Sequence, residues 1–415
     1  MPSLNPFRTL VRHRNFRLFW TGQTLSLVGT WMQTMAQGWL ALQLTDDAFL
    51  VGLVASVGAL PILLLSFPAG VYVDRVDRLR VVRVMQALML LEAAALWLLT
   101  WTGHVTIGAL LALAFANGIF SAFEIPARQA LMAELVTREE LPEAIALNSS
   151  GFNLARIAGP AIGAAVIATL GLAWCFALNA LSYLAVLAGL FLVRLPARAA
   201  APAHGPPLHA LREGLRYLWR TPGVRALMGV VLVFSVFGTP YLTLMPVVAR
   251  DVLGLGAGGY GSLLTAVGIG GLIGALGVAA LGSRVRPARW LAGASFAFAV
   301  LLVTFAFVRS AWVAQLVLLA TGCAMILNGA LANGLLQRLV PDALRGRTMA
   351  AYSFAVVGVA QVVGAFVAGA VARAVGADWA IGGGGLVMLA YATWQWSTSP
   401  GLIRLGEEPG MAAGR

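Results

Sequence analysis

Residues 49–80 read FLVGLVASVGALPILLLSFPAGVYVDRVDRLR, an apolar run that stops at a cluster of charges. A helix rises about 1.5 Å per residue, so about 20 apolar residues are enough to cross the hydrocarbon core of a bilayer. Residues 49–73 reach this length without a charged side chain. The stretch predicts a membrane-spanning helix, and the charges after it predict a short surface loop (Asp74, Arg75, Asp77, Arg78 and Arg80).

The rest of the 415-residue chain repeats this pattern. The chain is 60% hydrophobic and 11% charged, with a mean hydropathy of +0.86, whereas soluble domains carry about 25% charged residues. This composition excludes nearly every class of soluble enzyme and predicts an all-α polytopic membrane protein. We expect twelve transmembrane helices, near residues 17–43, 49–73, 82–102, 105–127, 147–170, 174–193, 224–249, 259–282, 288–308, 311–336, 349–372 and 379–399.

The arginines predict how these helices are oriented. Cytoplasmic loops of membrane proteins carry an excess of basic residues. With the N-terminus inside, 24 of the 28 arginines fall on cytoplasmic segments, three (Arg250, Arg309 and Arg373) fall on outer loops, and Arg156 lies within a span. We therefore expect both termini in the cytoplasm and a location in the bacterial inner membrane. Because the arginines come in short bursts between spans, we expect no nucleic-acid partner.

The chain divides into two similar halves. Residues 1–194 form a predicted bundle of six helices, 195–222 a cytoplasmic linker, 223–400 a second six-helix bundle, and 401–415 a cytoplasmic tail. The linker begins with prolines and ends in an amphipathic segment that predicts a helix lying on the membrane surface. Leu135-Val136 and Leu339-Val340 recur at a shift of 204 residues. Such repeats are typical of secondary transporters.

The loop that follows the quoted apolar run resembles a motif of the major facilitator superfamily, G-x-x-x-D-R-x-G-R-R/K. The matching residues are Gly70, Asp74, Arg75, Arg78 and Arg80, while Asp77 stands where the family has glycine. The stretches 15–33 and 126–149 resemble one branch, the transmembrane secretion effectors, which includes siderophore exporters. The resemblance implies two pseudo-symmetric six-helix bundles, a pathway lined by spans 1, 4, 7 and 10, and a cytoplasmic gate formed by these loop residues with Arg128.

The fifth span carries a second resemblance. Gly159, Pro160 and Gly163 are similar to the G-P-x-x-G-G motif of antiporters and exporters in this superfamily, although Ala164 replaces the last glycine. Small residues allow close helix approach, and proline removes a backbone donor. We expect these three residues to form a hinge. The alternative is that glycine and proline are common in any membrane helix.

Polar side chains form helical stripes on the expected pathway spans. In span 1, Gln23, Ser26, Thr30, Gln33 and Gln37 recur every three or four residues. Amides cannot face lipid without leaving groups unsatisfied, so this stripe must face protein or a watery cavity. The alternative is hydrogen bonding between helices. The predicted substrate pathway comprises Thr30, Trp31, Gln33, Gln37, Asn117, Ser121, Phe237, Thr239, Tyr241 and Asn328.

Few ionisable residues lie at membrane depth. Glu92 and Arg156 fall within spans 3 and 5, and Glu124 lies toward the cytoplasmic end of span 4. A buried charge costs at least about 2.5 kcal/mol on insertion scales and marks a functional candidate. We expect Glu92, Glu124 and Arg156 to be candidates for proton coupling, although a structural role for Glu92 is an equal alternative. Four further acids are expected to be a solvated face (Glu134, Glu139, Glu140 and Glu143).

These features predict a secondary active transporter, and specifically a proton-coupled exporter of a small apolar or amphiphilic molecule such as a siderophore or drug. No nucleotide-binding or hydrolase motif is present, and we expect no enzymatic activity, metal or cofactor. The expected partners are the substrate, protons and the lipid bilayer, and we expect a monomer. The alternatives are an importer or facilitator, or a receptor or lipid-binding scaffold that transports nothing.

Overall fold

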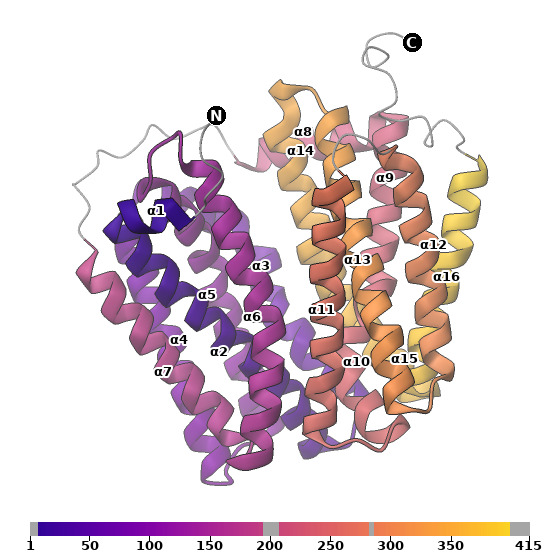
Figure 1. The fold of residues 1–415 in the computed structure, drawn as a ribbon, viewed down its shortest axis with the longest axis horizontal. Helices are drawn as coiled ribbons and strands as arrows, with labels where there is room; N and C mark the ends of the chain where they lie inside the picture. The colour runs from indigo at the N-terminus through magenta and orange to yellow at the C-terminus, as the bar shows by residue number, and fades with distance from the viewer. Residues whose placement is uncertain (1–6, 194–206, 282–285, 399–415) are drawn as a thin grey trace. The chain divides into compact units, whose positions relative to one another are not determined.

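The computed structural model describes residues 7–193, 207–281 and 286–398, and all regular secondary structure in these ranges is helical (Figure 1). The expected linker residues before 207, the loop arginine Arg284 and the expected tail from 401 lie outside the described residues. The chain forms two compact units. Unit 1 comprises residues 1–46 and 57–204, and unit 2 comprises residues 47–56 and 205–415.

Unit 1 is a helix bundle in which α2 packs against α6 and α7, and α4 packs against α5 and α7. The Thr106 side chain caps α5 by accepting a hydrogen bond from the Ala109 amide at 3.2 Å. Gly103 and Gly171 have φ values of 73° and 97° and allow the chain to turn between helices. The helices are α1 (Phe7–Arg12), α2 (Arg14–Thr45), α3 (Ala48–Arg75), α4 (Arg78–Trp101), α5 (Ile107–Glu134), α6 (Leu141–Thr169) and α7 (Ala173–Leu192).

Unit 2 contains the remaining helices and the first residues of α3. Ser56 on α3 donates a hydrogen bond to the Val362 carbonyl at 3.0 Å within this unit. Its elements are α8 (Pro207–Arg220), α9 (Pro222–Val233), η1 (Phe234–Gly238), α10 (Tyr241–Val247), η2 (Val248–Val252), α11 (Ala257–Leu281), α12 (Pro287–Phe307), α13 (Ala311–Leu339), α14 (Asp342–Ser353), η4 (Phe354–Val359), α15 (Ala360–Val375) and α16 (Ala377–Thr398). The η elements are π-helical segments, which are rare and occur frequently at functional sites.

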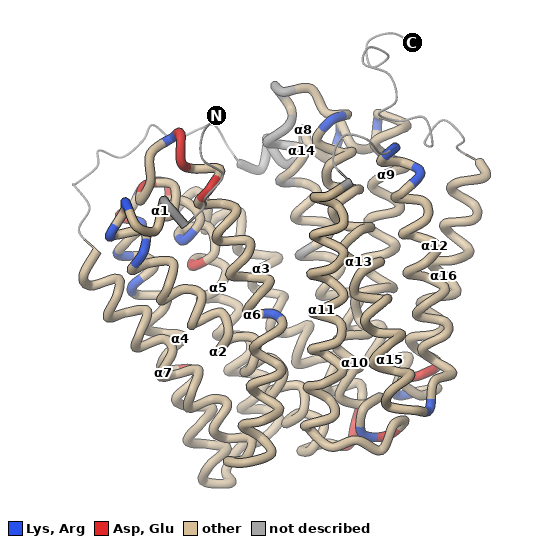
Figure 2. Tube along the Cα trace, in the orientation of Figure 1, with Lys and Arg blue, Asp and Glu red and all other residues tan. Residues whose placement is uncertain are grey.

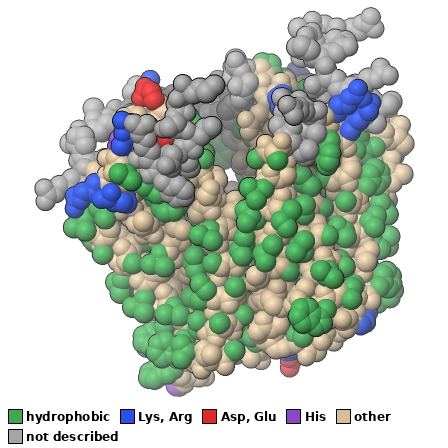
Figure 3. All heavy atoms as spheres, in the orientation of Figure 1, with side chains coloured by type: hydrophobic (Ala, Val, Ile, Leu, Met, Phe, Trp, Pro, Cys, Tyr) green, Lys and Arg blue, Asp and Glu red, His purple; other side chains and the backbone are tan. Residues whose placement is uncertain are grey.

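Each expected span coincides with a helix or a run of consecutive helical elements. Among the described residues, ten helices are long and apolar enough to cross a membrane. The expected spans 1 and 12 correspond to α2 and α16, which are not among those ten, so their crossing stays a prediction. Figure 3 shows hydrophobic side chains covering the visible face of the helices, with charged side chains near the helix ends. This distribution suits a surface in contact with lipid tails.

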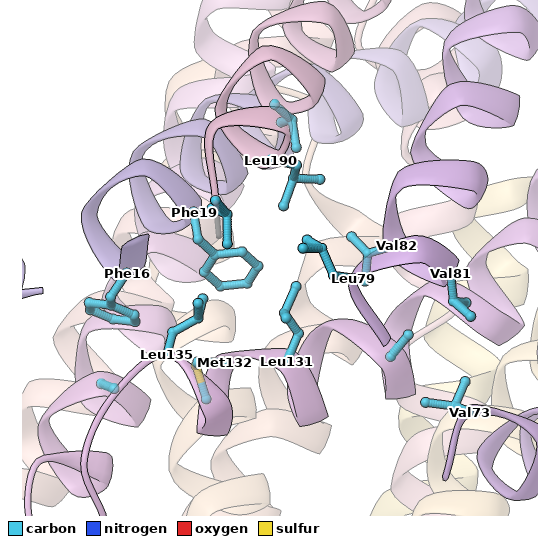
Figure 4. Packing of buried hydrophobic residues seen from close by; sticks show 14 of the residues in the cluster. Phe16, Phe19, Val73, Leu79, Val81, Val82, Leu131, Met132, Leu135 and Leu190 are labelled. Atoms are coloured by element: carbon cyan, nitrogen blue, oxygen red, sulfur yellow. The ribbon is translucent and has the colours of Figure 1, made fainter. Parts of the chain in front are cut away.

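In each unit the arginines gather mainly at one end, which we call the arginine-rich end (Figure 2). At this end of unit 1, Phe16 and Phe19 of α2 pack with Leu79 of α4 and Leu131 of α5 in a buried hydrophobic cluster (Figure 4). Arg83 Nη2 donates to the Leu190 carbonyl of α7 at 2.7 Å. Basic side chains near a helix C-terminus satisfy its free carbonyls and favour its dipole. Arginine therefore helps to close the end of α7.

The predicted hinge residues lie where α6 approaches α2. A Cβ atom at Gly159 would come within 2.5 Å of the Trp31 Cβ atom and 2.9 Å of the Val28 carbonyl oxygen. A Cβ atom at Gly163 would come within 3.0 Å of Met32. Pro160 is buried within α6, which continues through it as one helix. The glycines allow two backbones to pack closely, while a hinge motion at this site stays a prediction.

This close approach makes Gly159 sensitive to a single methyl group. We expect Gly159→Ala to lower the stability of the detergent-solubilised protein by about 1–3 kcal/mol, because the α2 backbone blocks the added atom. The matched control is Gly108→Ala in α5, where the nearest atom to an added Cβ lies 3.9 Å away. Thermal unfolding followed by circular dichroism measures both variants. Equal unfolding temperatures for the two variants would contradict this packing account.

Candidate functional site

A buried carboxyl group lies in the middle of unit 1. Glu92 on α4 is 3% exposed. Its Oε2 atom accepts hydrogen bonds from Gln33 Nε2 of α2 at 3.0 Å and from Asn117 Nδ2 of α5 at 3.1 Å. One carboxyl group therefore joins three helices, two of which are the expected pathway spans 1 and 4.

The hydrogen-bonded chain continues from Glu92 to a fourth helix. Gln33 Oε1 accepts a hydrogen bond from Asn179 Nδ2 of α7 at 2.8 Å, and Asn179 Oδ1 accepts one from Ser182 Oγ at 3.1 Å. On the other side, Ser121 Oγ donates to Asn117 Oδ1 at 3.3 Å. We call these six residues the Glu92 cluster (Gln33, Glu92, Asn117, Ser121, Asn179 and Ser182).

Stability alone does not account for an ionised carboxylate in this cluster. A charge at membrane depth costs at least about 2.5 kcal/mol on insertion scales. A hydrogen bond between membrane helices contributes about 0.6 kcal/mol on average, so two amide donors offset only about half of that cost. Arg156, the predicted cation for this depth, lies half-buried on α6 and is not a hydrogen-bond or ion-pair partner of Glu92. The structure therefore does not pair these two coupling candidates with each other.

Glu124 has a different environment. It is 4% exposed on α5, and its Oε1 atom accepts from Arg128 Nε of the next helical turn at 2.9 Å and from Gln86 Nε2 of α4 at 3.0 Å. The Arg128 guanidinium compensates the charge of the carboxylate locally. The gate prediction grouped Arg128 with the loop after span 2, with a static ion pair between Arg128 and Glu124 as an equal alternative. The described contacts of Arg128 are with Glu124, and its role in a gate stays a prediction.

The loop that resembles the superfamily motif, residues 70–80, forms its own ion pairs. Arg78 donates to Asp74 at 3.2 Å and to Glu134, at the end of α5, at 2.5 Å. Asp77, which replaces the family's glycine, caps α4 by accepting a hydrogen bond from the Arg80 amide at 3.2 Å. Aspartate is a favoured N-cap residue, so Asp77 suits the start of α4. Arg75 is exposed, and a Cβ atom at Gly70 would meet nothing within 4 Å.

Three of the four acids expected to form a solvated face are partly exposed and also make ion pairs or hydrogen bonds. Glu134 pairs with Arg78, Glu140 pairs with Arg12 and His13, and Glu143 accepts a hydrogen bond from Thr9 at 2.7 Å. Glu139 alone of the four is exposed. Glu140 also accepts a hydrogen bond from the nearby Thr137 at 3.2 Å, but its charged partners and Thr9, the partner of Glu143, lie on or beside α1, more than 120 residues earlier, so local sequence spacing could not identify them. These contacts hold α1 against the start of α6.

Most of the expected pathway residues of unit 2 make their contacts within the helix bundle. Asn328 of α13 is 5% exposed and donates to Ser295 Oγ of α12 at 2.7 Å. Tyr241 is 2% exposed and packs edge-on against Phe298. The Thr239 hydroxyl donates to the Ser235 carbonyl at 2.7 Å. Phe237, in the π-helical segment η1, is the exposed member of this group, at 36%.

Two expected pathway residues of unit 1 lie outside the Glu92 cluster but next to it. The Thr30 and Tyr183 hydroxyls are 3.3 Å apart, and Trp31 packs edge-on against Phe152 with ring centroids at 5.7 Å. Gln37 is half-buried further along α2. Sequence reasoning did not select Asn179, Ser182 or Tyr183 of α7. Their spacing of three and four residues within an apolar span is the signal that could have identified them.

The fold and this site together define a class of protein. Two units of apolar helices with a buried polar cluster are typical of a helical membrane transporter. The chain belongs to the transmembrane secretion effector family of the major facilitator superfamily, and the match covers residues 3–399. The members of this family are multi-pass transporters rather than enzymes.

Known proteins support this assignment. The multidrug efflux pump Tap of Mycolicibacterium fortuitum is 32% identical over 336 residues, which cover 77% of this chain and 80% of Tap. The enterobactin exporter EntS of Escherichia coli is 27% identical over 348 residues, which cover 81% of this chain and 80% of EntS. A bacterial homologue of the human lysosomal transporter Spinster has the same fold, with a TM-score of 0.73 and 13% identity over 96% of this chain and 98% of that chain.

The contacts of Glu140 predict a pH-dependent stability. The hydrogen bond with His13 lowers the pKa of Glu140 below its ordinary value of 4.5, with a smaller contribution from Arg12. A lowered pKa in the folded state means that the carboxylate stabilises the fold above pH 4.5, and that this contribution is lost as the pH falls. We expect the unfolding temperature of the Glu140→Gln variant to depend less on pH between about pH 6 and pH 4 than that of the wild type.

The control is Glu139→Gln, which changes the exposed neighbouring carboxylate and should retain the wild-type pH dependence. Differential scanning fluorimetry in detergent across this pH range gives both comparisons. An identical pH dependence in the wild type and in Glu140→Gln would show that the contact between Glu140 and α1 does not contribute to stability.

Proposed function

We propose that this chain is a proton-coupled exporter of a small apolar or amphiphilic molecule that works by alternating access. The observation that carries this proposal is the Glu92 cluster. A carboxyl group is held at the centre of unit 1 by neutral amide donors, and its only described partners come from the two expected pathway helices α2 and α5. A group that changes its charge in this position changes the hydrogen bonding of both helices.

The hydrogen-bond chemistry of the cluster suggests how a proton acts. An ionised carboxylate only accepts hydrogen bonds, whereas a protonated one also donates. When Glu92 gains a proton, one amide partner must rotate to present its oxygen in place of its NH2 group. In the structure, Asn179 donates a hydrogen bond to Gln33 Oε1. If Gln33 rotates, its NH2 group turns toward Asn179 and two donors face each other. Asn179 must then rotate as well, so one proton rearranges contacts among α2, α4 and α7.

Protons and substrate would therefore act on the same polar side chains. Gln33 and Asn117 are the predicted substrate ligands nearest to Glu92, and Ser121 lies behind Asn117. A substrate that donates hydrogen bonds to the amide oxygens of Gln33 and Asn117 would hold their NH2 groups toward Glu92, which favours the ionised carboxylate and release of its proton. We propose that the proton is held when the substrate is absent and exchanged for it when the two units rock, with both termini cytoplasmic and the chain acting as a monomer.

The proposed cargo class follows from the chemistry of the pathway side chains. They combine amides and hydroxyls with aromatic rings, including Trp31 and Phe237, and only one ionisable side chain lies in the Glu92 cluster. Side chains of these kinds suit molecules with apolar rings and a few polar groups. The names of the relatives, a multidrug efflux pump and an enterobactin exporter, agree with this class. Import, or facilitated diffusion without protons, is the alternative.

The coupling proposal is tested in proteoliposomes with an imposed pH gradient. A panel of enterobactin and ethidium probes the siderophore-like and drug-like ends of the class. We expect proton flux that depends on a transported compound, lost in Glu92→Gln while that compound still binds. If Glu124, which pairs with Arg128, carries the proton in place of Glu92, then Glu124→Gln will lose the proton flux. Glu139→Gln is the matched control and should retain wild-type flux.

The direction of transport is read from the same vesicles, because the sign of the pH gradient sets the direction of accumulation. Uptake into vesicles by protein whose cytoplasmic face points outward, driven by an acidic interior, supports export. Full proton-linked flux in both Glu92→Gln and Glu124→Gln would contradict coupling through these carboxyl groups. Substrate flux that does not depend on the pH gradient would support a facilitator, or a transporter driven by membrane potential.

The proposed gate at the arginine-rich end gives a second functional prediction. Asp74 is half-exposed and pairs with Arg78, which also contacts Glu134. We expect Asp74→Asn to lower the rate of transport by up to about fivefold at equal protein level, because a partly exposed ion pair contributes little more than this. The control is Arg138→Gln, since Arg138 is exposed and is not one of the predicted gate residues. A wild-type rate of transport in Asp74→Asn would show that Asp74 is not part of the gate.

A further inference from the structure

Unit 2 contains a cavity that the transport proposal does not use. Its volume is about 690 Å³, which lies within the range of pockets that bind small ligands. The walls come from four elements at the arginine-rich end of the unit: the surface helix α8, the first turns of α9, the π-helical segment η4 and the last turns of α16. We call it the α8 pocket.

The interior of the α8 pocket is apolar. Leu215 and Leu218 of α8 face Met228 of α9, Phe354 of η4 and Trp394 of α16. Gly229 contributes no side chain, and a Cβ atom there would collide with the Tyr391 hydroxyl. Tyr391 instead donates a hydrogen bond to Gln395 at 3.1 Å. The pocket can therefore hold a long apolar group.

The rim of the pocket is cationic. Arg225, three residues after the start of α9, is exposed and lines the pocket. Arg216 and Arg220 are exposed on α8 at the same end. Among the side chains that the structure describes, the ion pairs do not include Arg216, Arg220 or Arg225. An occupant with an apolar chain and an anionic head would complete both parts of the site.

The place of the pocket identifies the source of such an occupant. α8 lies directly before α9, a membrane span, so the pocket is at the level where a span meets the membrane surface. Trp219 and Trp394 line the pocket and are 68% and 57% exposed. Exposed tryptophans favour the boundary between lipid tails and water. The anionic amphiphile most abundant at this boundary is a phospholipid, and basic pockets between membrane helices bind such head groups.

We propose that the α8 pocket binds one anionic phospholipid of the adjacent leaflet, with an acyl chain between α8, α9 and α16 and the phosphate against Arg225. The bound lipid ties the surface helix α8 to η4 and α16, which belong to different parts of the chain. It thereby stabilises unit 2 next to its π-helical segment. A transported compound fits the rim less well, because the proposed cargo class does not require an anion.

The test is native mass spectrometry of the full chain released from nanodiscs that contain equal amounts of phosphatidylglycerol and phosphatidylcholine. We expect one retained lipid per chain, with a preference for phosphatidylglycerol of about fivefold, the ratio that corresponds to ~1 kcal/mol for one arginine near the membrane surface. Arg225→Gln should abolish the preference. Ala226→Phe, which fills the pocket, should abolish retention of the lipid.

Arg338→Gln is the matched control, because Arg338 is exposed at the end of α13 and does not line the pocket. Thermal unfolding in detergent confirms that each variant is folded before its lipids are compared. Equal retention of the two lipids by the wild type would overturn the proposal, as would unchanged retention in both pocket variants. Displacement of the lipid by a transported compound would also overturn it, because the pocket would then belong to the transport pathway.

Discussion

The hydrogen bonds that Gln33 and Asn117 donate to Glu92 are the interaction on which the account of unit 1 depends. They bring a carboxyl group into an apolar bundle, where charge is expensive, and they attach it to the two helices expected to line the transport pathway. The surrounding sequence accommodates this arrangement. Gly29 has no side chain because a Cβ atom there would collide with Asn179, which completes the chain of amides. A larger residue at position 29 would separate α2 from α7 and open the cluster.

The two units differ in how polar groups are distributed among their helices. Unit 1 concentrates its polarity in side chains, with a connected set of amides around one carboxyl group. Unit 2 has sparser polar contacts, such as that of Asn328 with Ser295, and instead interrupts its helices with the π-helical segments η1, η2 and η4. A π-helical turn leaves backbone groups less regularly paired and gives a helix a place to bend. Under the proposed function, unit 1 would hold the proton-binding group, and unit 2 would supply helices that can bend.

Much of the fold could be predicted from the sequence because lipid allows few structures. Apolar runs of about 20 residues identified the helices, whereas the family was identified from the resemblance of the loop after span 2 and of residues 15–33 and 126–149 to known motifs. The site was predicted only in part. Periodicity selected Gln33 and Asn117, but it could not show that Glu92 joins them, because that depends on how three helices rotate against one another. The pairs of Glu140 and Glu143 with residues near α1 were missed for the same reason, since their partners are distant in the chain.

The central claim is that substrate and proton compete at Glu92, and proton release on binding tests it most directly. The purified protein is mixed with the transported member of the panel in weakly buffered detergent solution, and the change in pH is recorded as the compound binds. The account predicts proton release from the wild type, with none from Glu92→Gln despite binding of the compound. Binding to the wild type without proton release, or equal release from Glu92→Gln, would contradict the claim.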